Sequence, residues 1–176
     1  FQIFKETFAQ ENYDYQSNAC YVQRTSQFEM LPIRNADLVF VGDSITGRFE
    51  WSEYYTDYTV ANRGIDSDIT EGVYHRLDNI VSLSPKKIFL MIGINDIGRG
   101  IPSSSTMYHY ENIVDELTTA LPDCEIYLQS VLPVNHSTGI SNETVQALNE
   151  EIRQLADQKG LTYLDIYSEV VTADNN

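Results

Sequence analysis

The sequence has few basic residues, few cysteines and no long apolar run, and each shortage argues against a class of protein. Its 11 lysines and arginines stand against 26 aspartates and glutamates, and the formal net charge of −15 disfavours nucleic acid and anionic membrane surfaces as partners. No stretch approaches the ~18 consecutive apolar residues of a membrane-spanning helix, so we expect no membrane span. A glycine-rich phosphate loop is also missing after the first predicted strand, which disfavours flavin or nucleotide binding.

The two cysteines give no metal site. Cys20 and Cys124 lie far apart and in no metal-ligand spacing, and we expect neither a metal nor a cofactor. A disulfide between them is one interpretation for a secreted protein. Because Cys124 opens a predicted buried strand, a buried free thiol is favoured.

Short β-favouring apolar runs alternate with segments of helical apolar spacing along the whole chain. The predicted strands cover residues 38–41, 59–62, 87–92, 125–131 and 161–165. The predicted helices cover residues 68–83, 104–121 and 142–159. This alternation predicts a parallel sheet with helices on both faces, a three-layer α/β/α sandwich in one domain.

The first 36 residues are rich in tyrosine and polar residues, and we interpret them as a helical packing segment. Two short helices are predicted there, over residues 1–8 and 20–31. The alternative is that Tyr13, Tyr15 and Tyr21 form an aromatic surface that binds sugars.

Small and polar residues follow the first three predicted strands. The first strand ends in Gly42-Asp43-Ser44, a tight turn that would present the Ser44 hydroxyl, and residues 62–70 and 93–96 follow the next two strands. Because parallel strands gather their carboxyl ends at one edge of a sheet, Ser44 would meet backbone N–H donors and the Asn95 amide. A hydroxyl beside such donors is typical of a nucleophilic site with an oxyanion hole. The alternative is an ordinary strand-to-helix turn in which Asp43 or Ser44 caps the next helix.

Residues 42–44, 62–65 and 93–96, in this order and spacing, resemble the signature blocks of the SGNH (GDSL) hydrolases. Within that superfamily, the residues of these blocks are similar to those of the small acetyl-esterase branch, which includes platelet-activating-factor acetylhydrolase-like and sialate O-acetylesterase-like proteins. Residues 129–135 and 161–165 also fit, so the resemblance extends from about Tyr21 to the end. It implies one domain over residues 1–176 with a five-stranded flavodoxin-like sheet of strand order 2-1-3-4-5.

The resemblance also implies residue roles. Ser44 would be the nucleophile and donate one backbone N–H to the oxyanion, and the side-chain amide of Asn95 would supply another donor. The family's second-block donor is the backbone N–H of a glycine that falls at Ser67 here. That N–H survives the change, but a positive φ at this position would strain a serine.

In the family, an Asp-x-x-His pair near the C-terminus takes the proton of the serine. None of the three histidines lies three residues after an Asp, and only His136, in a loop after a strand end, is placed to approach the site; the other two are His75 and His109. We therefore expect that the chain stops before the block that holds the base. We also expect that the closing helix of the family is missing and that these residues alone form an impaired hydrolase.

The loop after the fourth predicted strand is a candidate wall of the substrate pocket. Val134 would contact the acyl group and Asn135 the leaving alcohol, although the loop can also be an ordinary connection. Four acids near the site are expected to cap turns and helix starts and not to act as a paired acid and base: Asp43, Asp66, Asp68 and Asp96.

The sequence therefore predicts a serine esterase that acts on a small-molecule ester, with acetyl on a carbohydrate or similar alcohol as the favoured substrate. The alternative is a noncatalytic ligand-binding module that keeps the pocket but lacks the base.

Overall fold

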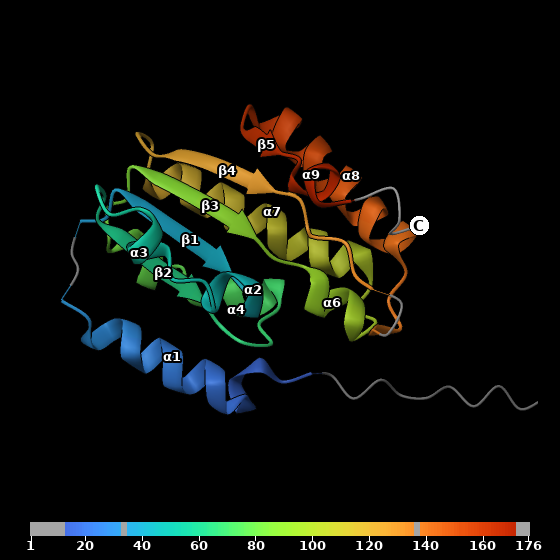
Figure 1. Ribbon diagram of the computed structural model, residues 1–176, viewed down its shortest axis with the longest axis horizontal. Coiled ribbons are helices and arrows are strands. Elements are labelled where there is room, and N and C mark those ends of the chain that lie inside the picture. The colour runs from blue at the N-terminus through green and yellow to red at the C-terminus, as the bar shows by residue number, and fades with distance from the viewer. Residues whose placement is uncertain (1–12, 33–34, 136–137, 172–176) are drawn as a thin grey trace, which may run out of the picture.

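The computed structural model describes residues 13–32, 35–135 and 138–171, and a five-stranded sheet lies at its centre (Figure 1). The strand order is β2-β1-β3-β4-β5, and each neighbouring pair is parallel. The strands are β1 (Leu38–Gly42), β2 (Val60–Gly64), β3 (Lys87–Met91), β4 (Glu125–Gln129) and β5 (Thr162–Leu164). The predicted class and strand order are confirmed.

One face of the sheet carries most of the hydrophobic core. Its helices are α4 (Thr70–Tyr74), α5 (Asp78–Val81), α7 (Ser103–Ala120) and α8 (Asn142–Lys159). The strand side chains that point to this face, such as Val39 and Leu90, are fully buried against them. Helix α7 presents Tyr110, Ile113 and Leu117 to this core, which is the i, i+3, i+7 spacing of an amphipathic helix.

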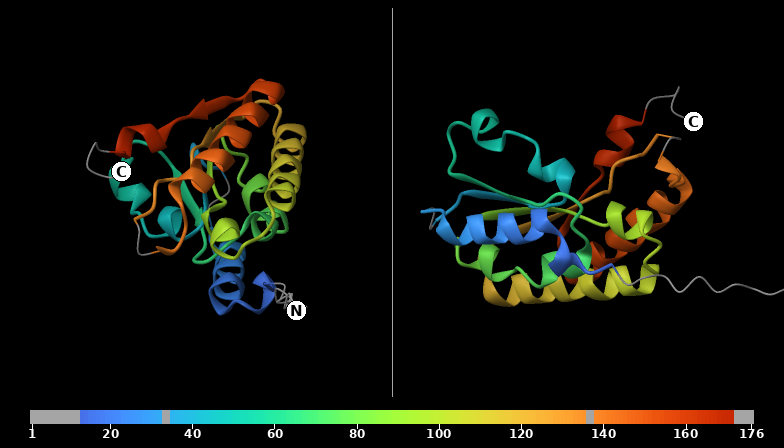
Figure 2. Two further views of the ribbon diagram at one scale, coloured as in Figure 1. Left: turned by 90° about the vertical axis from the view of Figure 1, so that its right-hand side faces the viewer. Right: turned by 90° about the horizontal axis from the view of Figure 1, so that it is seen from below.

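The second face is covered by shorter elements. Helix α3 (Trp51–Tyr54) lays the Trp51 ring flat on Phe40 of β1, with 3.7 Å between the ring centroids. Figure 2 shows α3 and α9 (Ile166–Val170) on the opposite side of the sheet from α7 and α8. Helices thus lie on both faces, as a three-layer sandwich requires.

The single helix predicted over residues 68–83 is wrong. The structure has two short helices there, α4 and α5, joined by a turn that contains Arg76. The Arg76 side chain turns inward and forms an ion pair with Asp68 at 2.8 Å, and both side chains are almost completely buried. A charged side chain that reaches a buried partner interrupts the helix, and apolar periodicity carries no sign of that pairing.

The N-terminal segment packs against the flank beside β2 and α4. It contains a 3-10 turn, η1 (Tyr15–Ser17), and α1 (Ala19–Met30), which confirms the helix predicted over 20–31; the helix predicted over 1–8 lies outside the described residues. Tyr15 and Tyr21 are buried in a small core with Ile65. The packing interpretation is therefore confirmed for these two tyrosines, and a sugar-binding role for half-buried Tyr13 stays a prediction.

Neither cysteine is in a disulfide. Cys20 is exposed and Cys124 is half-buried, and both are free thiols, so the disulfide interpretation is wrong. Within the described residues, no helix is long and apolar enough to cross a membrane.

Candidate active site

The carboxyl ends of β1, β2 and β3 lie side by side. In the sheet register, Gly42 at the end of β1 pairs with Gly64 of β2 on one side and with Met91 of β3 on the other. The segments that carry Ser44, Ser67 and Asn95 therefore leave the sheet from neighbouring strands at one edge. This is where parallel sheets bind their ligands.

Ser44 is the first residue of the short helix α2 (Ser44–Gly47). The Asp43 carboxylate caps this helix by accepting a hydrogen bond of 2.9 Å from the backbone N–H of Ile45. Trp51 Nε1 donates to the carbonyl of Thr46 at 2.8 Å and so holds the far side of the turn. The Ser44 side chain is half-buried, and no other described residue forms a hydrogen bond with its hydroxyl.

The end of β2 is bonded directly to the Ser44 turn. Asn62 Nδ2 donates to the carbonyl of Gly47 at 3.0 Å, while Asn62 Oδ1 accepts from the backbone N–H of Gly64 at 2.9 Å. A Cβ on Gly64 would lie 2.5 Å from the Cα of Gly47, so this position has no room for a side chain. The α2 turn and the loop after β2 therefore form one packed unit.

Ser67 has φ of 65°, in the left-handed region that favours glycine. The strain foreseen for a serine at this position is thus present. A non-glycine residue held there costs of the order of 1–2 kcal/mol, and such a residue persists only where its surroundings determine the conformation.

Asn95 lies at the start of α6 (Ile94–Gly98), just after Gly93 with φ of 127°. Its Nδ2 donates one hydrogen bond to the carbonyl of Asp68 at 2.9 Å. An amide nitrogen carries two N–H groups, so the second remains for a ligand. This bond also ties Asn95 to the residue that follows Ser67.

Three carboxylates are buried beneath the site, and each has a structural partner. Asp43 caps α2, Asp68 pairs with Arg76, and Asp96 accepts bonds from the backbone and hydroxyl of Thr70 at the start of α4. Burial raises the pKa of Asp43 and of Asp96 to about 6. Half-buried Asp66 pairs with exposed Arg48 at 2.6 Å. The expected capping roles are confirmed for Asp43 and Asp96.

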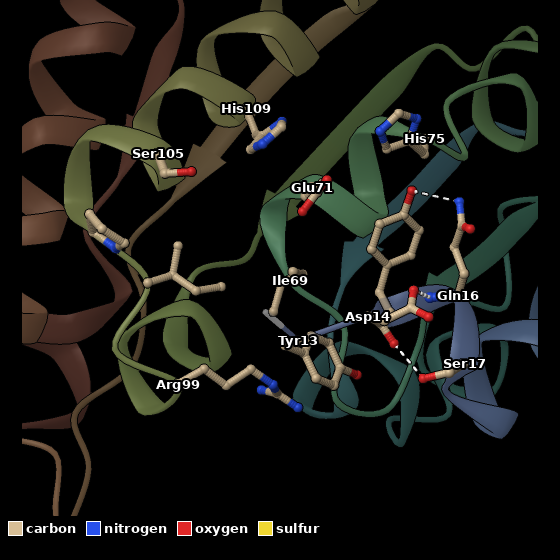
Figure 3. Close-up of a pocket in the computed structure, with 13 residues that line it drawn as sticks. Tyr13, Asp14, Gln16, Ser17, Ile69, Glu71, His75, Arg99, Ser105 and His109 are labelled. Carbon is tan, nitrogen blue, oxygen red and sulfur yellow. Dashed lines mark hydrogen bonds between the residues drawn. The ribbon is translucent and has the colours of Figure 1, made fainter. Parts of the chain in front are cut away.

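His75 and His109 lie on the flank of the sheet, as expected, and line a cleft of about 1090 Å³ between η1 and α7 (Figure 3). Here we call it the N-terminal cleft; its walls include Tyr13, Tyr15, Glu71 and Arg99. The His75 ring stacks on Tyr15, with 5.6 Å between the centroids, and burial lowers the pKa of His109. His136 lies outside the described residues.

Val134 lies in the loop after β4 and is held in place by Asn142 of α8. The backbone N–H of Val134 donates to Asn142 Oδ1 at 2.9 Å, and Asn142 Nδ2 donates back to the carbonyl of Val134 at 3.0 Å. Val134 is half-buried against the core, and Asn135 is exposed. Among the described contacts, none joins either residue to Ser44, so their substrate roles stay predictions.

Sequence reasoning did not find the contacts of Tyr13 and Arg99 with the site. Tyr13 Oη donates to the carbonyl of Ser67 at 3.3 Å, and Arg99 Nη1 donates to the carbonyl of Asn95 at 3.2 Å. No local pattern reports the first contact, because Tyr13 and Ser67 are 54 residues apart in sequence; the second spans four residues but depends on the rotamer of Arg99.

Comparison with known proteins finds the same fold in several hydrolases. The family described as "GDSL-like Lipase/Acylhydrolase family" matches residues 40–176. A Streptococcus pneumonia protein, named as a candidate platelet activating factor, is 27% identical with a TM-score of 0.79, over 89% of this chain and 78% of that chain. A GDSL-like lipase from Bacteroides thetaiotaomicron is 19% identical with a TM-score of 0.72, over 88% of this chain and 82% of that chain.

AlinE4, an SGNH-hydrolase family esterase, is 16% identical with a TM-score of 0.63, over 77% of this chain and 78% of that chain. At this identity, the lipase and AlinE4 are similar to this chain in fold. No curated protein matches the chain.

Proposed function

Because this chain belongs to the GDSL-like lipase/acylhydrolase family, we propose that it hydrolyses small acyl esters with Ser44 as the nucleophile. One observation carries this assignment. The register of β1 with β2 and β3 brings the segments of Ser44, Ser67 and Asn95 to neighbouring positions at one edge of the sheet.

In the proposed reaction, the Ser44 hydroxyl attacks the acyl carbon and gives its proton to a base. The carbonyl oxygen takes the electron pair of the broken π bond and becomes an oxyanion. When the tetrahedral intermediate collapses, the alcohol leaves with a proton and the acyl group stays on Ser44 Oγ. A water molecule then repeats the attack and releases the carboxylic acid.

Three N–H groups are proposed to hold the oxyanion: those of the Ser44 and Ser67 backbone and the second N–H of Asn95 Nδ2. The bond from Asn95 to the Asp68 carbonyl supports this, because it fixes the amide before substrate arrives. Donors fixed in advance need no reorganisation as charge develops, and one such donor is worth about 10²–10³ in turnover.

The base is the part of the reaction that the described residues do not supply. No described side chain forms a hydrogen bond with the Ser44 hydroxyl, and His75 and His109 face the N-terminal cleft. The family resemblance assigns this role to an Asp-x-x-His pair, which the 176 residues do not contain. A base added from solution can therefore reveal whether the rest of the site works.

Acetyl on a carbohydrate or a similar alcohol remains the proposed substrate. Half-buried Val134, fixed by its two hydrogen bonds with Asn142, suits a wall against a short acyl chain. Exposed Asn135 is proposed to contact the alcohol part.

Hydrolysis of p-nitrophenyl acetate, with and without added imidazole, tests the assignment. Ser44→Ala is the test variant, and Ser104→Ala, an exposed serine on α7, is the matched control. We expect hydrolysis above the Ser44→Ala background, more so with imidazole, and an acetyl adduct that peptide mass mapping assigns to Ser44.

Equal rates for the wild type and Ser44→Ala, with no adduct in either, would overturn the enzymatic assignment. Retained binding of an acetylated sugar in that case would favour the noncatalytic binding module.

A further inference from the structure

The N-terminal segment contacts the loop that carries the proposed oxyanion donor. Tyr13 Oη donates to the carbonyl of Ser67 at 3.3 Å, and Asn18 Nδ2 donates to Tyr13 Oη at 2.8 Å and to the carbonyl of Asp66 at 3.3 Å. Asn18 is itself fixed, because its Oδ1 caps α1 by accepting from the N–H of Cys20. Tyr13 and Asn18 lie outside residues 40–176, which the family description matches.

The same tyrosine also reaches the second donor. Its ring lies 3.9 Å from the guanidinium carbon of Arg99, and Arg99 Nη1 donates to the carbonyl of Asn95 at 3.2 Å. Figure 3 shows Tyr13 and Arg99 next to each other at one end of the N-terminal cleft. One side chain is therefore linked to the backbone of both Ser67 and Asn95.

Ser67 needs such support more than a glycine would. Its φ of 65° is unfavourable for an L residue, and a conformation of this kind persists only where neighbouring groups fix it. The bond from Tyr13 to the Ser67 carbonyl fixes the peptide group after Ser67, and the bond from Asn18 to the Asp66 carbonyl fixes the peptide group before it, which carries the Ser67 N–H. Losing it would let the loop turn its N–H groups away from the substrate.

We propose that Tyr13 is a positioning residue of the oxyanion hole. Its hydroxyl holds the Ser67 peptide in the left-handed conformation, and its ring, through Arg99, holds Asn95. This inference rests on the proposed function, because it takes the Ser67 N–H and the Asn95 amide as the donors. Tyr13 itself touches no reacting atom.

Tyr13→Phe tests the hydroxyl, because it removes the bond to Ser67 and keeps the ring on Arg99. The matched control is Tyr15→Phe, since the Tyr15 hydroxyl accepts from Gln16 Nε2 in the same segment. With p-nitrophenyl acetate and imidazole, we expect kcat to fall about three- to tenfold in Tyr13→Phe, the effect of one neutral hydrogen bond. KM should stay within about twofold, and Tyr15→Phe should match the wild type.

A second pair of variants separates positioning from a general loss of structure. Glycine adopts the left-handed conformation without help, so Tyr13→Phe should cost less than about twofold in kcat when Ser67 is already glycine. An effect through overall stability would reduce kcat by the same factor in both backgrounds. That additive result would overturn the proposal.

An amide NMR spectrum gives a readout that does not depend on catalysis. We expect the Ser67 N–H resonance to shift or broaden in Tyr13→Phe and to keep its position in Tyr15→Phe. If the wild type shows no Ser44-dependent hydrolysis, the proposed function has failed, whatever this spectrum shows. If the wild type is active but Tyr13→Phe has normal kcat and an unchanged Ser67 resonance, only the role of Tyr13 has failed.

Discussion

Replacing Ser67 by glycine should make the protein more stable and leave its chemistry in place. At φ of 65°, a serine costs about 1–2 kcal/mol relative to the right-handed conformation. Glycine avoids this strain but loses about 0.5–1 kcal/mol more conformational entropy on folding. With the middle of each range, the net gain in the free energy of unfolding is about 0.75 kcal/mol. For a chain of 176 residues, this corresponds to a rise of about 1–4 °C in Tm.

Thermal unfolding followed by circular dichroism measures this change. Ser67→Ala is the first control, because alanine keeps the strain and should bring no gain. Ser84→Gly is the second, since Ser84 is the other described non-glycine residue with positive φ, at 44°, and is exposed away from the site.

Both glycine variants should raise Tm, and the turnover of Ser67→Gly should stay within about threefold because the backbone N–H is kept. An unchanged or lower Tm for Ser67→Gly, or an equal gain from Ser67→Ala, would refute the reasoning about strain.

Three further predictions concern the site. Asn95→Ala should lower kcat by about 10²–10³ and leave KM for p-nitrophenyl acetate within about threefold, and an unchanged kcat would remove Asn95 from the oxyanion hole. Val134→Ala should widen the acyl pocket, so the ratio of butyrate to acetate hydrolysis should rise severalfold; an unchanged ratio would place Val134 outside that pocket. Asp43 has its pKa raised from 3.8 to about 6 by burial, so its stabilising contribution is complete below about pH 4 and lost as the pH rises through about 6. Asp43→Asn keeps an oxygen that accepts from the Ile45 N–H but cannot ionise. Between pH 4 and pH 7, the free energy of unfolding measured in urea should therefore fall about 1–3 kcal/mol further in the wild type than in Asp43→Asn. Identical pH profiles would contradict the raised pKa.

Much of the fold follows from the sequence because the sheet is buried on both faces at its centre. The apolar runs at β1 and β3 carry a direct signal, and β1 was predicted to within one residue of Leu38–Gly42. The short helices α2 and α6 were not predicted, since four or five residues are too few to show a period. Each begins just after a strand ends: Asp43 caps α2, whereas α6 follows Gly93, whose φ of 127° turns the chain.

The sequence predicts the residues of the candidate site but not the contacts that hold them in place. Ser44, Ser67 and Asn95 follow strand ends, so parallel topology predicts that their segments lie at one edge of the sheet, and the family resemblance supplies the strand order that makes them neighbours. The bond from Tyr13 to Ser67 and the ion pair of Asp68 with Arg76 depend on how distant segments pack in three dimensions. A single sequence carries no periodic signal for such contacts.

The contact between Gly47 and Gly64 limits how the molecule can adapt to ligands of different size. With backbone against backbone at this point, the end of β2 and the helix of Ser44 cannot separate without breaking the Asn62 bonds that join them. We therefore expect this half of the pocket to behave as a rigid wall. Adjustment to a larger acyl or alcohol group should come from the proposed wall after β4, which the side chains of Asn149 and Asn142 hold from α8.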